Sequence, residues 1–359
     1  MATATLRQLL DDVIARKASD LHIGVGMPPA MRIDGVLSSV QGLDPMTFEE
    51  VERAFLEVLS EDRYRQFAAL GELDFSFAHM SAAGNEARFR GNCYREMHGM
   101  SAAFRLIPTK ILSIDDLRLP EVLRDMAHKR RGLFLVTGPT GHGKSTTLAA
   151  VINEINATRQ EHIITIEDPI EFVHRPKLCV IHQREVGTDT ASFAEALKRA
   201  LREDPDVILI GELRDLETIA SAITAAETGH FVLGTLHTQD ASQSIDRLID
   251  VFPPHQQQQI RIQLASVLVG ICSQQLIPKN GGGRVCATEI LVANSAVRNN
   301  IREGKTNQIR TLIQTGATLG MHTMEQCLAD CVLSGSLTRE TAMTYAYNPL
   351  ELDRSLAGH

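Results

Sequence analysis

The residues with the clearest chemical purpose are Gly138-Pro-Thr-Gly-His-Gly143-Lys144-Ser145. They match the pattern GxxxxGK[ST] and lie between an apolar run, residues 133–136, and a segment with helical spacing. Glycines let the backbone wrap closely around phosphate oxygens, and N–H groups at the start of a helix point toward the anion. The pattern therefore predicts a nucleotide-phosphate site made of Gly138, Pro139, Thr140, Gly141, His142, Gly143, Lys144, Ser145 and Thr146.

Two residues of this site, Lys144 and Ser145, are expected to have separate tasks. The Lys144 ammonium supplies charge to the β- and γ-phosphates of ATP, and the Ser145 hydroxyl is a ligand for Mg²⁺. Such a site needs a second acidic strand end to hold the metal. Residues 206–212 read Asp-Val-Ile-Leu-Ile-Gly-Glu, an apolar strand that ends in a carboxylate. Glu212 is therefore the predicted second magnesium residue, and ATP and Mg²⁺ are the expected cofactors.

An acidic segment and two histidines are further candidates. Residues 166–171 place three carboxylates at the end of another predicted strand, where they would polarise an attacking water. The alternative is a loop whose acidic residues cap a helix. His230 and His237 flank the apolar run 231–236. A neutral imidazole near a γ-phosphate can sense the loss of that phosphate, but a structural role for each histidine is an equal alternative.

The elements that must position these residues alternate from Gly132 onward. Near-continuous apolar strands separated by helices are typical of a parallel sheet covered on both faces. After about residue 255 we expect mostly helix. The expected strands are residues 133–137, 163–167, 207–211 and 231–236, and the expected helices are residues 146–156, 192–201 and 216–227.

Residues 1–112 have a different pattern, which predicts a small α+β domain. An apolar stripe at helical spacing is formed by Leu6, Leu9, Leu10, Val13 and Ile14. The succession of short strands predicts an antiparallel sheet with flanking helices. The expected strands are residues 20–23, 31–33, 36–40, 74–77, 87–94 and 101–107.

Two local signals refine this first domain. Asp34-Gly35 predicts a hairpin turn, and Thr47 with Glu50 predicts a capping box that opens a helix to Leu59. We expect a helical connector over residues 113–131, within a helical stretch that begins at Pro108. The ATPase domain then covers residues 132–359, with a helical C-terminal part.

Composition argues against several other classes of protein. The net charge is −8, and the chain has no Trp and four Tyr, which disfavours the basic or aromatic-lined channel of a nucleic-acid motor. The longest apolar runs fall far short of the roughly 20 residues that span a bilayer, and no signal peptide is visible. The six cysteines form no CxxC pair, so zinc is not expected and a reduced, cytoplasmic setting is.

Four ordered boxes resemble the PilT-type retraction motors of the type IV pilus, within the secretion ATPase superfamily. Besides residues 138–146, they are residues 164–174 (an acidic box), 204–215 (an atypical Walker B segment) and 228–237 (a histidine box). The segments Ala18-Ser-Asp-Leu-His22 and Arg32-Ile-Asp-Gly35 also fit. The resemblance covers nearly the whole chain.

The resemblance implies an α/β fold with a PAS-like N-terminal domain, a RecA-like P-loop ATPase domain and a homohexameric ring. By the family's pattern Glu171 is the candidate general base, with Glu212 near the metal. Arg90 and Arg105 are candidates to reach the phosphates of a neighbouring or closing subunit, and His230 and His237 become functional candidates. The implied work is ATP-driven pilus retraction and twitching motility, without nucleic acid.

The implied setting is the cytoplasmic side of the inner membrane, through a pilus platform protein and with a PilU-like paralogue as another partner. The alternatives are a PilU-like accessory motor, a type IV secretion ATPase, and a nucleotide-gated binding protein without turnover. Two residues depart from the family's pattern. Asn300 replaces Leu in residues 296–303, which resemble the family's retraction motif, and we expect a polar side chain there to be costly if it packs against apolar surface. His142 replaces a small residue of the P-loop, and we expect its side chain to point outward.

Overall fold

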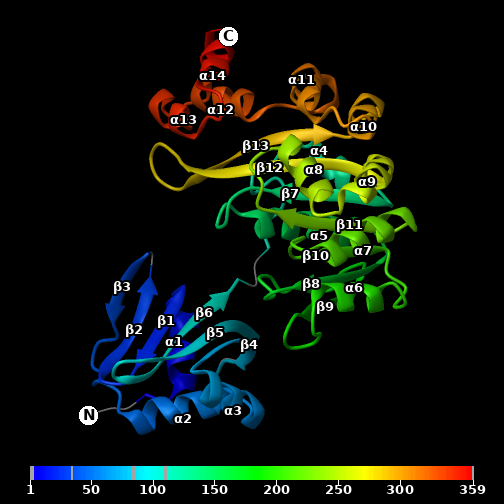
Figure 1. Ribbon diagram of the computed structural model, residues 1–359. Helices are drawn as coiled ribbons and strands as arrows, with labels where there is room; N and C mark the ends of the chain where they lie inside the picture. The colour runs from blue at the N-terminus through cyan, green and yellow to red at the C-terminus, as the bar shows by residue number, and fades with distance from the viewer. Residues whose placement is uncertain (1–3, 34, 83, 85, 109–110, 358–359) are drawn as a thin grey trace. The chain divides into compact units, whose positions relative to one another are not determined.

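The computed structural model describes residues 4–33, 35–82, 84, 86–108 and 111–357 (Figure 1). These residues form two compact units. The first is Met1–Lys110 together with the short segment Pro169–Val173, and the second is Ile111–Asp168 together with His174–His359.

The first unit contains a six-stranded antiparallel sheet, in agreement with the expected architecture. Its strand order is β3-β2-β1-β6-β5-β4, and α1, α2 and α3 supply its helices. The bounds are α1 Leu6–Ala15, β1 Asp20–Gly24, β2 Met27–Ile33, β3 Val36–Ser39, α2 Phe48–Val58, α3 Glu61–Leu70, β4 Glu72–Met80, β5 Glu86–Glu96 and β6 Gly99–Ile107.

Alternation along the strands gives this sheet one apolar and one polar face. On β5, Phe89 and Cys93 are buried in the core, whereas Arg88 and Arg90 lie on the opposite face. On α1, four of the five predicted apolar residues are fully buried, and Ile14 packs against them. The sheet thus presents a row of arginines on the face that α1 and α2 do not cover.

The helix cap and the hairpin of this unit lie where the sequence predicts them. The Thr47–Glu50 capping box is present at the start of α2. β2 and β3 pair with Ile33 opposite Val36, and Gly35 has φ +84°. The turn residue Asp34 lies outside the described residues. The helix α3 was not predicted, although Ser60 caps its start and the left-handed Gly71 ends it.

The second unit contains a seven-stranded sheet with the order β13-β12-β7-β11-β10-β8-β9. The strands from β12 to β9 are mutually parallel, and β13 pairs antiparallel with β12. The bounds are β7 Gly132–Thr137, β8 His162–Glu167, β9 Val180–Glu185, β10 Val207–Ile210, β11 Phe231–Leu236, β12 Leu268–Pro278 and β13 Arg284–Val292. The predicted parallel sheet is therefore confirmed.

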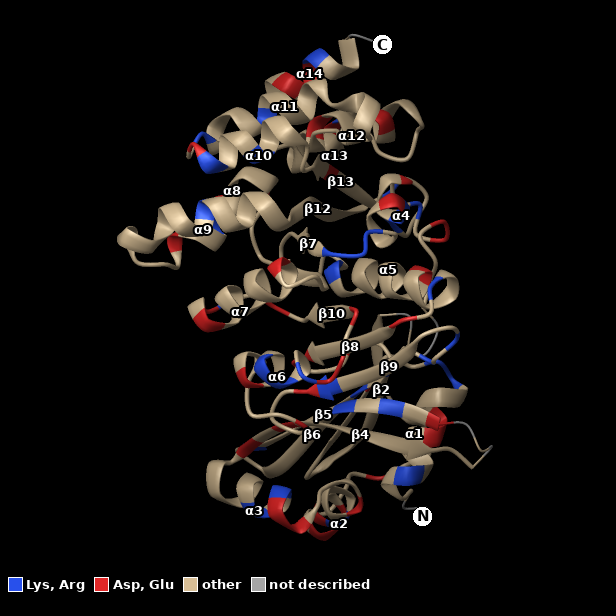
Figure 2. Cartoon of the chain, turned by 90° about the vertical axis from the view of Figure 1, so that its right-hand side faces the viewer, with Lys and Arg blue, Asp and Glu red and all other residues tan. Residues whose placement is uncertain are grey.

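Helices cover this sheet on both faces (Figure 2). Alternate residues of β7 belong to two different cores: Leu133 and Leu135 pack with α6 to α9, while Phe134 and Val136 pack with α4 and α5. The covering helices are α4 Val122–Ala127, α5 Lys144–Thr158, α6 Phe193–Ala200, α7 Leu216–Glu227, α8 Ala241–Asp250 and α9 Pro254–Val267.

One sequence prediction for the second unit is incomplete, and another is wrong. The region after residue 255 is mostly helical, as expected, but it also contains the long hairpin of β12 and β13, which extends the sheet. Nearly every residue of β12 is buried because both of its faces are covered, so the strand lacks the alternation that marks a half-exposed strand. The connector is helical only over Val122–Ala127. Before it, Ser113 and Asp116 exchange backbone-to-side-chain hydrogen bonds in a turn.

The remaining helices pack beyond the β12–β13 hairpin. α12 and α14 contact one another, and Ile277 and Ala287 of the hairpin belong to the same apolar core as α12 to α14. Among the described residues, no helix is both long and apolar enough to cross a lipid bilayer. The bounds are α10 Ser295–Arg302, α11 Ile309–Thr315, α12 Met324–Leu333, α13 Arg339–Tyr345, α14 Pro349–Ala357 and the 3₁₀ turns Thr306–Gln308 and Ala317–Leu319.

Candidate functional site

The site lies where the parallel strands of the second unit end. β7, β11, β10 and β8 are neighbours, so their carboxyl ends meet at one edge of the sheet. The P-loop follows β7, His237 follows β11, and Glu212 follows β10 with one residue between. Separate sequence boxes are therefore brought to one edge by the strand order.

The glycines of the P-loop occupy conformations and spaces that other residues do not fit. Gly138, Gly141 and Gly143 have φ values of +140°, +79° and +83°. A Cβ atom on Gly138 would lie 2.3 Å from the Gln274 carbonyl oxygen of β12. Gly143 precedes α5 without a side-chain cap, so the first N–H groups of this helix are directed at the loop. This backbone cradle fits a phosphate group.

The Lys144 ammonium is held across the loop. Its side chain is buried, and Nζ donates to the carbonyl oxygens of Gly138 at 2.8 Å and Pro139 at 3.1 Å. Nζ also lies 3.3 Å from Nδ1 of His237. A buried cation at the centre of a phosphate cradle is suited to bind the β- and γ-phosphates of a nucleotide.

His237 connects this lysine to Glu212. Its Nε2 lies 3.1 Å from the Glu212 carboxylate, while its Nδ1 faces Lys144. Lysine can only donate and a carboxylate only accepts, so these contacts assign a neutral ring with the proton on Nε2. The structure thus brings Lys144, His237 and Glu212 together in one chain of contacts.

Glu212 is held in its ionised form. Burial raises its pKa, but hydrogen bonds from Arg214 and His237 outweigh that effect, and the net shift is downward. Arg214 Nε lies 2.5 Å from the carboxylate. An ionised carboxylate beside a P-loop, together with the Ser145 hydroxyl at the start of α5, is the oxygen donor set that Mg²⁺ prefers. Sequence reasoning gave Arg214 no role, although its position in the box 204–215 was a signal for one.

His142 points toward β12. Its Nδ1 accepts a hydrogen bond from the Leu276 N–H at 3.1 Å, and its carbonyl accepts one from Gln274 Nε2 at 2.7 Å. Burial, followed by the nearby charges of Lys144 and Arg284, lowers the pKa of His142. The neutral ring therefore connects the P-loop to the neighbouring strand β12. The sequence predicted an outward side chain but not this contact.

The structure does not bring His230 to this cluster within the chain. His230 precedes β11 and His237 follows it, so the strand separates them. His230 Nδ1 lies 2.9 Å from the Ala225 carbonyl oxygen and 3.2 Å from Thr228 Oγ1, at the end of α7. A direct role for His230 in catalysis stays a prediction.

The acidic box is divided between the two units. Glu167 ends β8 and accepts hydrogen bonds from Thr165 at 2.6 Å and Gln183 at 3.2 Å. Glu171 lies in the segment Pro169–Val173, which groups with the first unit. Its role as general base stays a prediction.

Arg90 and Arg105 are direct cross-strand neighbours on the polar face of the first unit. Arg105 Nε donates to Asp20 at 2.8 Å, and Arg90 lies 3.8 Å from Asp74. Burial raises the pKa of the Asp20 carboxyl group, but hydrogen bonds from Ser19 and Arg105 lower that pKa by more. The net shift is downward, so this carboxylate is ionised. Two arginines from distant positions thus share one surface, as an anion-binding pair requires.

In the segment 296–303, the Arg298 side chain binds backbone groups outside its own helix. Its guanidinium donates to four carbonyl oxygens, those of Ala265, Ser266, Leu268 and Ala293, at 2.6–3.0 Å. The first three lie at the end of α9, so Arg298 caps one helix from another. On the same helix α10, Val297 and Ile301 face the core.

Asn300 is half-buried at the flank of α10, where the cost of a polar side chain is smaller than in the core. Its backbone carbonyl accepts a hydrogen bond from the Lys305 N–H. The effect of this departure on retraction stays a prediction.

Acidification is expected to destabilise the fold through His174 at the end of the acidic box. This side chain is 7% exposed, burial lowers its pKa to about 4, and its Nδ1 has no hydrogen-bond partner among the described residues. The unfolded pKa is about 6.5, so the unfolded chain binds the proton more tightly. The contribution of the neutral His174 ring to the free energy of unfolding is complete above pH 6.5. It is lost as the pH falls toward 4, by roughly 3 kcal/mol in total.

Urea unfolding from about pH 7 to about pH 4.5 measures this effect. His174→Gln should flatten the pH dependence, whereas the exposed control His98→Gln should keep the wild-type slope. Equal slopes for wild type and His174→Gln would contradict the assignment.

The chain is similar to known proteins over most of its length. Residues 2–342 match the family described as Type II/IV secretion system protein. Type IV pilus retractation ATPase PilT of Pseudomonas aeruginosa is 47% identical over 96% of this chain and 98% of its own length. Type IV pilus ATPase PilU of the same organism is 38% identical over 94% of this chain and 88% of its own length.

Among solved structures, the crystal structure of the pilus retraction motor PilT with bound ADP superimposes with a TM-score of 0.91. It is 46% identical in sequence and covers 98% of this chain and 100% of its own. The matched fold, the P-loop cradle and the extent of these alignments all indicate the same family. The chain belongs to the Type II/IV secretion system protein family.

Proposed function

We propose that this chain is an ATP-hydrolysing motor that powers retraction of type IV pili and, through it, twitching motility. The observation that carries the proposal is the chain of contacts from Lys144 through His237 to Glu212 at the P-loop. The 47% identity to the retraction ATPase PilT supports the specific task more strongly than the 38% identity to PilU supports an accessory motor.

In the proposed mechanism, Lys144 binds the β- and γ-phosphates, and its contact with His237 responds when the γ-phosphate leaves. His237 is hydrogen-bonded to Glu212 through the other ring nitrogen, so a shift of the lysine is transmitted to that carboxylate. Ser145 and Glu212 would hold Mg²⁺, which when bound neutralises charge on the phosphates. Glu171 would orient the attacking water.

Arg90 and Arg105 are proposed to stabilise charge on the transferring phosphoryl group of a neighbouring or closing subunit. Arg105 uses Nε for Asp20, and within the described residues its two terminal nitrogens carry no further hydrogen bond. These nitrogens form the fork that binds phosphate in a bidentate manner.

We propose a homohexameric ring as the working assembly, because arginines supplied between subunits require copies of the chain side by side. Its proposed location is the cytoplasmic face of the inner membrane, where a platform protein of the pilus would hold it. A PilU-like paralogue is a further proposed partner.

ATP hydrolysis by the purified chain, measured as phosphate release at several protein concentrations beside light scattering, tests this proposal. Activity should rise as the hexamer forms, should not respond to single-stranded DNA, and should be lost in Glu212→Ala. Glu217→Ala is the matched control, because this carboxylate is exposed on α7 and pairs with Lys198 on the surface. The same chain should restore twitching to a piliated bacterium that lacks its retraction ATPase.

Three outcomes would contradict parts of the proposal. Wild-type protein without turnover would exclude the ATPase. Activity of a monomer that is independent of concentration would exclude sites shared around a ring. Full ATPase activity without restored twitching would favour an accessory or secretion motor instead of the retraction motor.

A further inference from the structure

The loop that carries His237 is anchored from a distant part of the chain. This loop joins β11 to α8 through residues 237–240, and its first residue contacts both Lys144 and Glu212. His237 is exposed and sits at the end of its strand, so the position of its ring depends on what holds the loop. Two hydrogen bonds from residues outside β7, β10 and β11 hold this loop.

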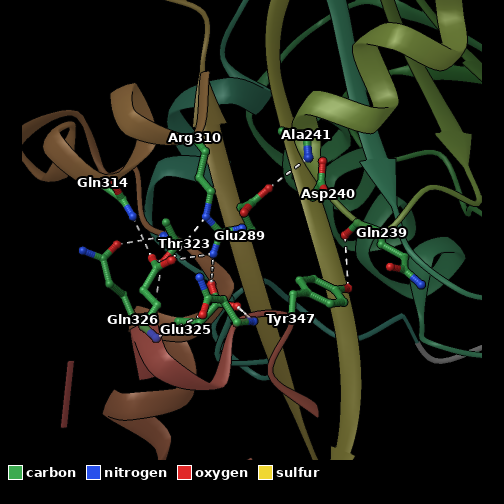
Figure 3. A network of polar contacts seen from close by, with 12 residues as sticks. Gln239, Asp240, Ala241, Glu289, Arg310, Gln314, Thr323, Glu325, Gln326 and Tyr347 are labelled. Atoms are coloured by element: carbon green, nitrogen blue, oxygen red, sulfur yellow. Dashed lines mark hydrogen bonds and ion pairs between the residues drawn. The ribbon is translucent and has the colours of Figure 1, made fainter. Parts of the chain in front are cut away.

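Figure 3 shows both contacts, one to the loop backbone and one to the backbone of the first residue after the loop. The Tyr347 hydroxyl donates to the Gln239 carbonyl oxygen at 3.2 Å. The Glu289 carboxyl on β13 accepts a hydrogen bond from the Ala241 N–H at 2.9 Å, at the first residue of α8. The side chain of Asp240, which lies between these anchors, caps α8 through the Gln243 N–H. The loop is therefore fixed from both sides.

Tyr347 is itself held by a rigid frame. Next to it in the chain, the Asn348 N–H donates to Glu325 Oε1 at 2.9 Å. The Glu325 side chain is fully buried on α12 and pairs with Arg310 at 2.6 Å. Arg310 also binds Glu351 of α14 at 2.7 Å. Removing a partner from a buried, paired carboxylate costs free energy, so these contacts restrain the segment between α13 and α14.

A second link fixes the same segment from β12. Gln275 Nε2 donates to the Tyr345 carbonyl oxygen at 3.4 Å. The preceding residue Gln274 bonds to the P-loop at His142. The segment 345–348 therefore contacts the strand that supports the P-loop as well as the His237 loop.

We propose that Tyr347 is a positioning residue for ATP hydrolysis, which holds the 237–240 loop so that His237 meets Lys144 and Glu212 together. A hydrogen bond weakens steeply beyond its normal range, and a displacement of about 1 Å of the ring would break one of the two contacts. The Tyr347 hydroxyl thereby connects the segment between α13 and α14 to the loop that carries His237. This inference rests on the proposed ATPase activity.

Tyr347→Phe tests the proposal, because it removes the hydroxyl and keeps the ring. At saturating ATP we expect kcat to fall by about fivefold, the rate equivalent of one hydrogen bond, while KM changes by less than about twofold. Tyr345→Phe is the matched control on the same segment. The described residues provide no hydrogen bond to the Tyr345 hydroxyl, so this variant should retain wild-type kcat.

Hydrogen–deuterium exchange of both variants supplies a readout that does not depend on turnover. Amides of residues 237–241 should exchange faster in Tyr347→Phe and at the wild-type rate in Tyr345→Phe, with equal melting temperatures. A wild-type kcat in Tyr347→Phe, or a lower kcat without faster exchange in the loop, would overturn the inference. Wild-type protein without turnover would instead refute the proposed function. In that case, unchanged amide exchange of residues 237–241 in Tyr347→Phe would still refute the anchoring of the loop by Tyr347.

Discussion

Replacing Lys144 with alanine is expected to reduce kcat/KM for ATP by at least about a thousandfold, because the substitution removes the cation that binds the β- and γ-phosphates. The same ammonium holds the P-loop by donating to the Gly138 and Pro139 carbonyl oxygens. It also contacts His237, so the variant loses the first member of the chain of contacts that reaches Glu212. Phosphate release and the affinity for a fluorescent ATP analogue measure the loss.

The control for this variant is Lys198→Ala. Lys198 lies exposed on α6 and pairs with surface carboxylates, so its removal should leave both readouts unchanged. Circular dichroism must show that Lys144→Ala remains folded. Turnover within about tenfold of wild type in a folded Lys144→Ala protein would contradict the assignment of the phosphate site.

Replacing Arg298 with alanine is expected to lower the free energy of unfolding by about 3–5 kcal/mol, which is large among single substitutions. The guanidinium donates to four carbonyl oxygens at 2.6–3.0 Å, and three of them belong to the end of α9. Helix ends leave carbonyl groups without intrahelical partners, and here one side chain satisfies them. The shift of the urea unfolding midpoint measures the effect.

Two comparison variants make the Arg298 prediction specific. Arg298→Lys retains the charge but not the planar fork of donors, so its loss should be intermediate. Arg302→Ala removes an exposed arginine from the same helix and should change stability by less than about 0.5 kcal/mol. Equal losses for Arg298→Ala and Arg302→Ala would contradict the capping role.

Local sequence determined the elements whose pattern repeats within a few residues. The P-loop, the apolar strands before and after it and the capping box at Thr47 each depend on neighbouring residues, and each is found where the pattern predicts it. β12 and β9 were missed for a physical reason. β12 is buried on both faces, so it has no alternation, and β9 is an edge strand with mixed exposure.

The contacts within the candidate site were decided by the tertiary structure. Glu212 and His237 were predicted separately, but only the strand order places β11 between β7 and β10, where the ring can contact Lys144 and Glu212 at once. Arg298 binds the end of a helix some thirty residues earlier, and Tyr347 binds a carbonyl oxygen 108 residues away. Sequence periodicity carries no information on such partners, because it records which face of an element is buried and not what lies against that face.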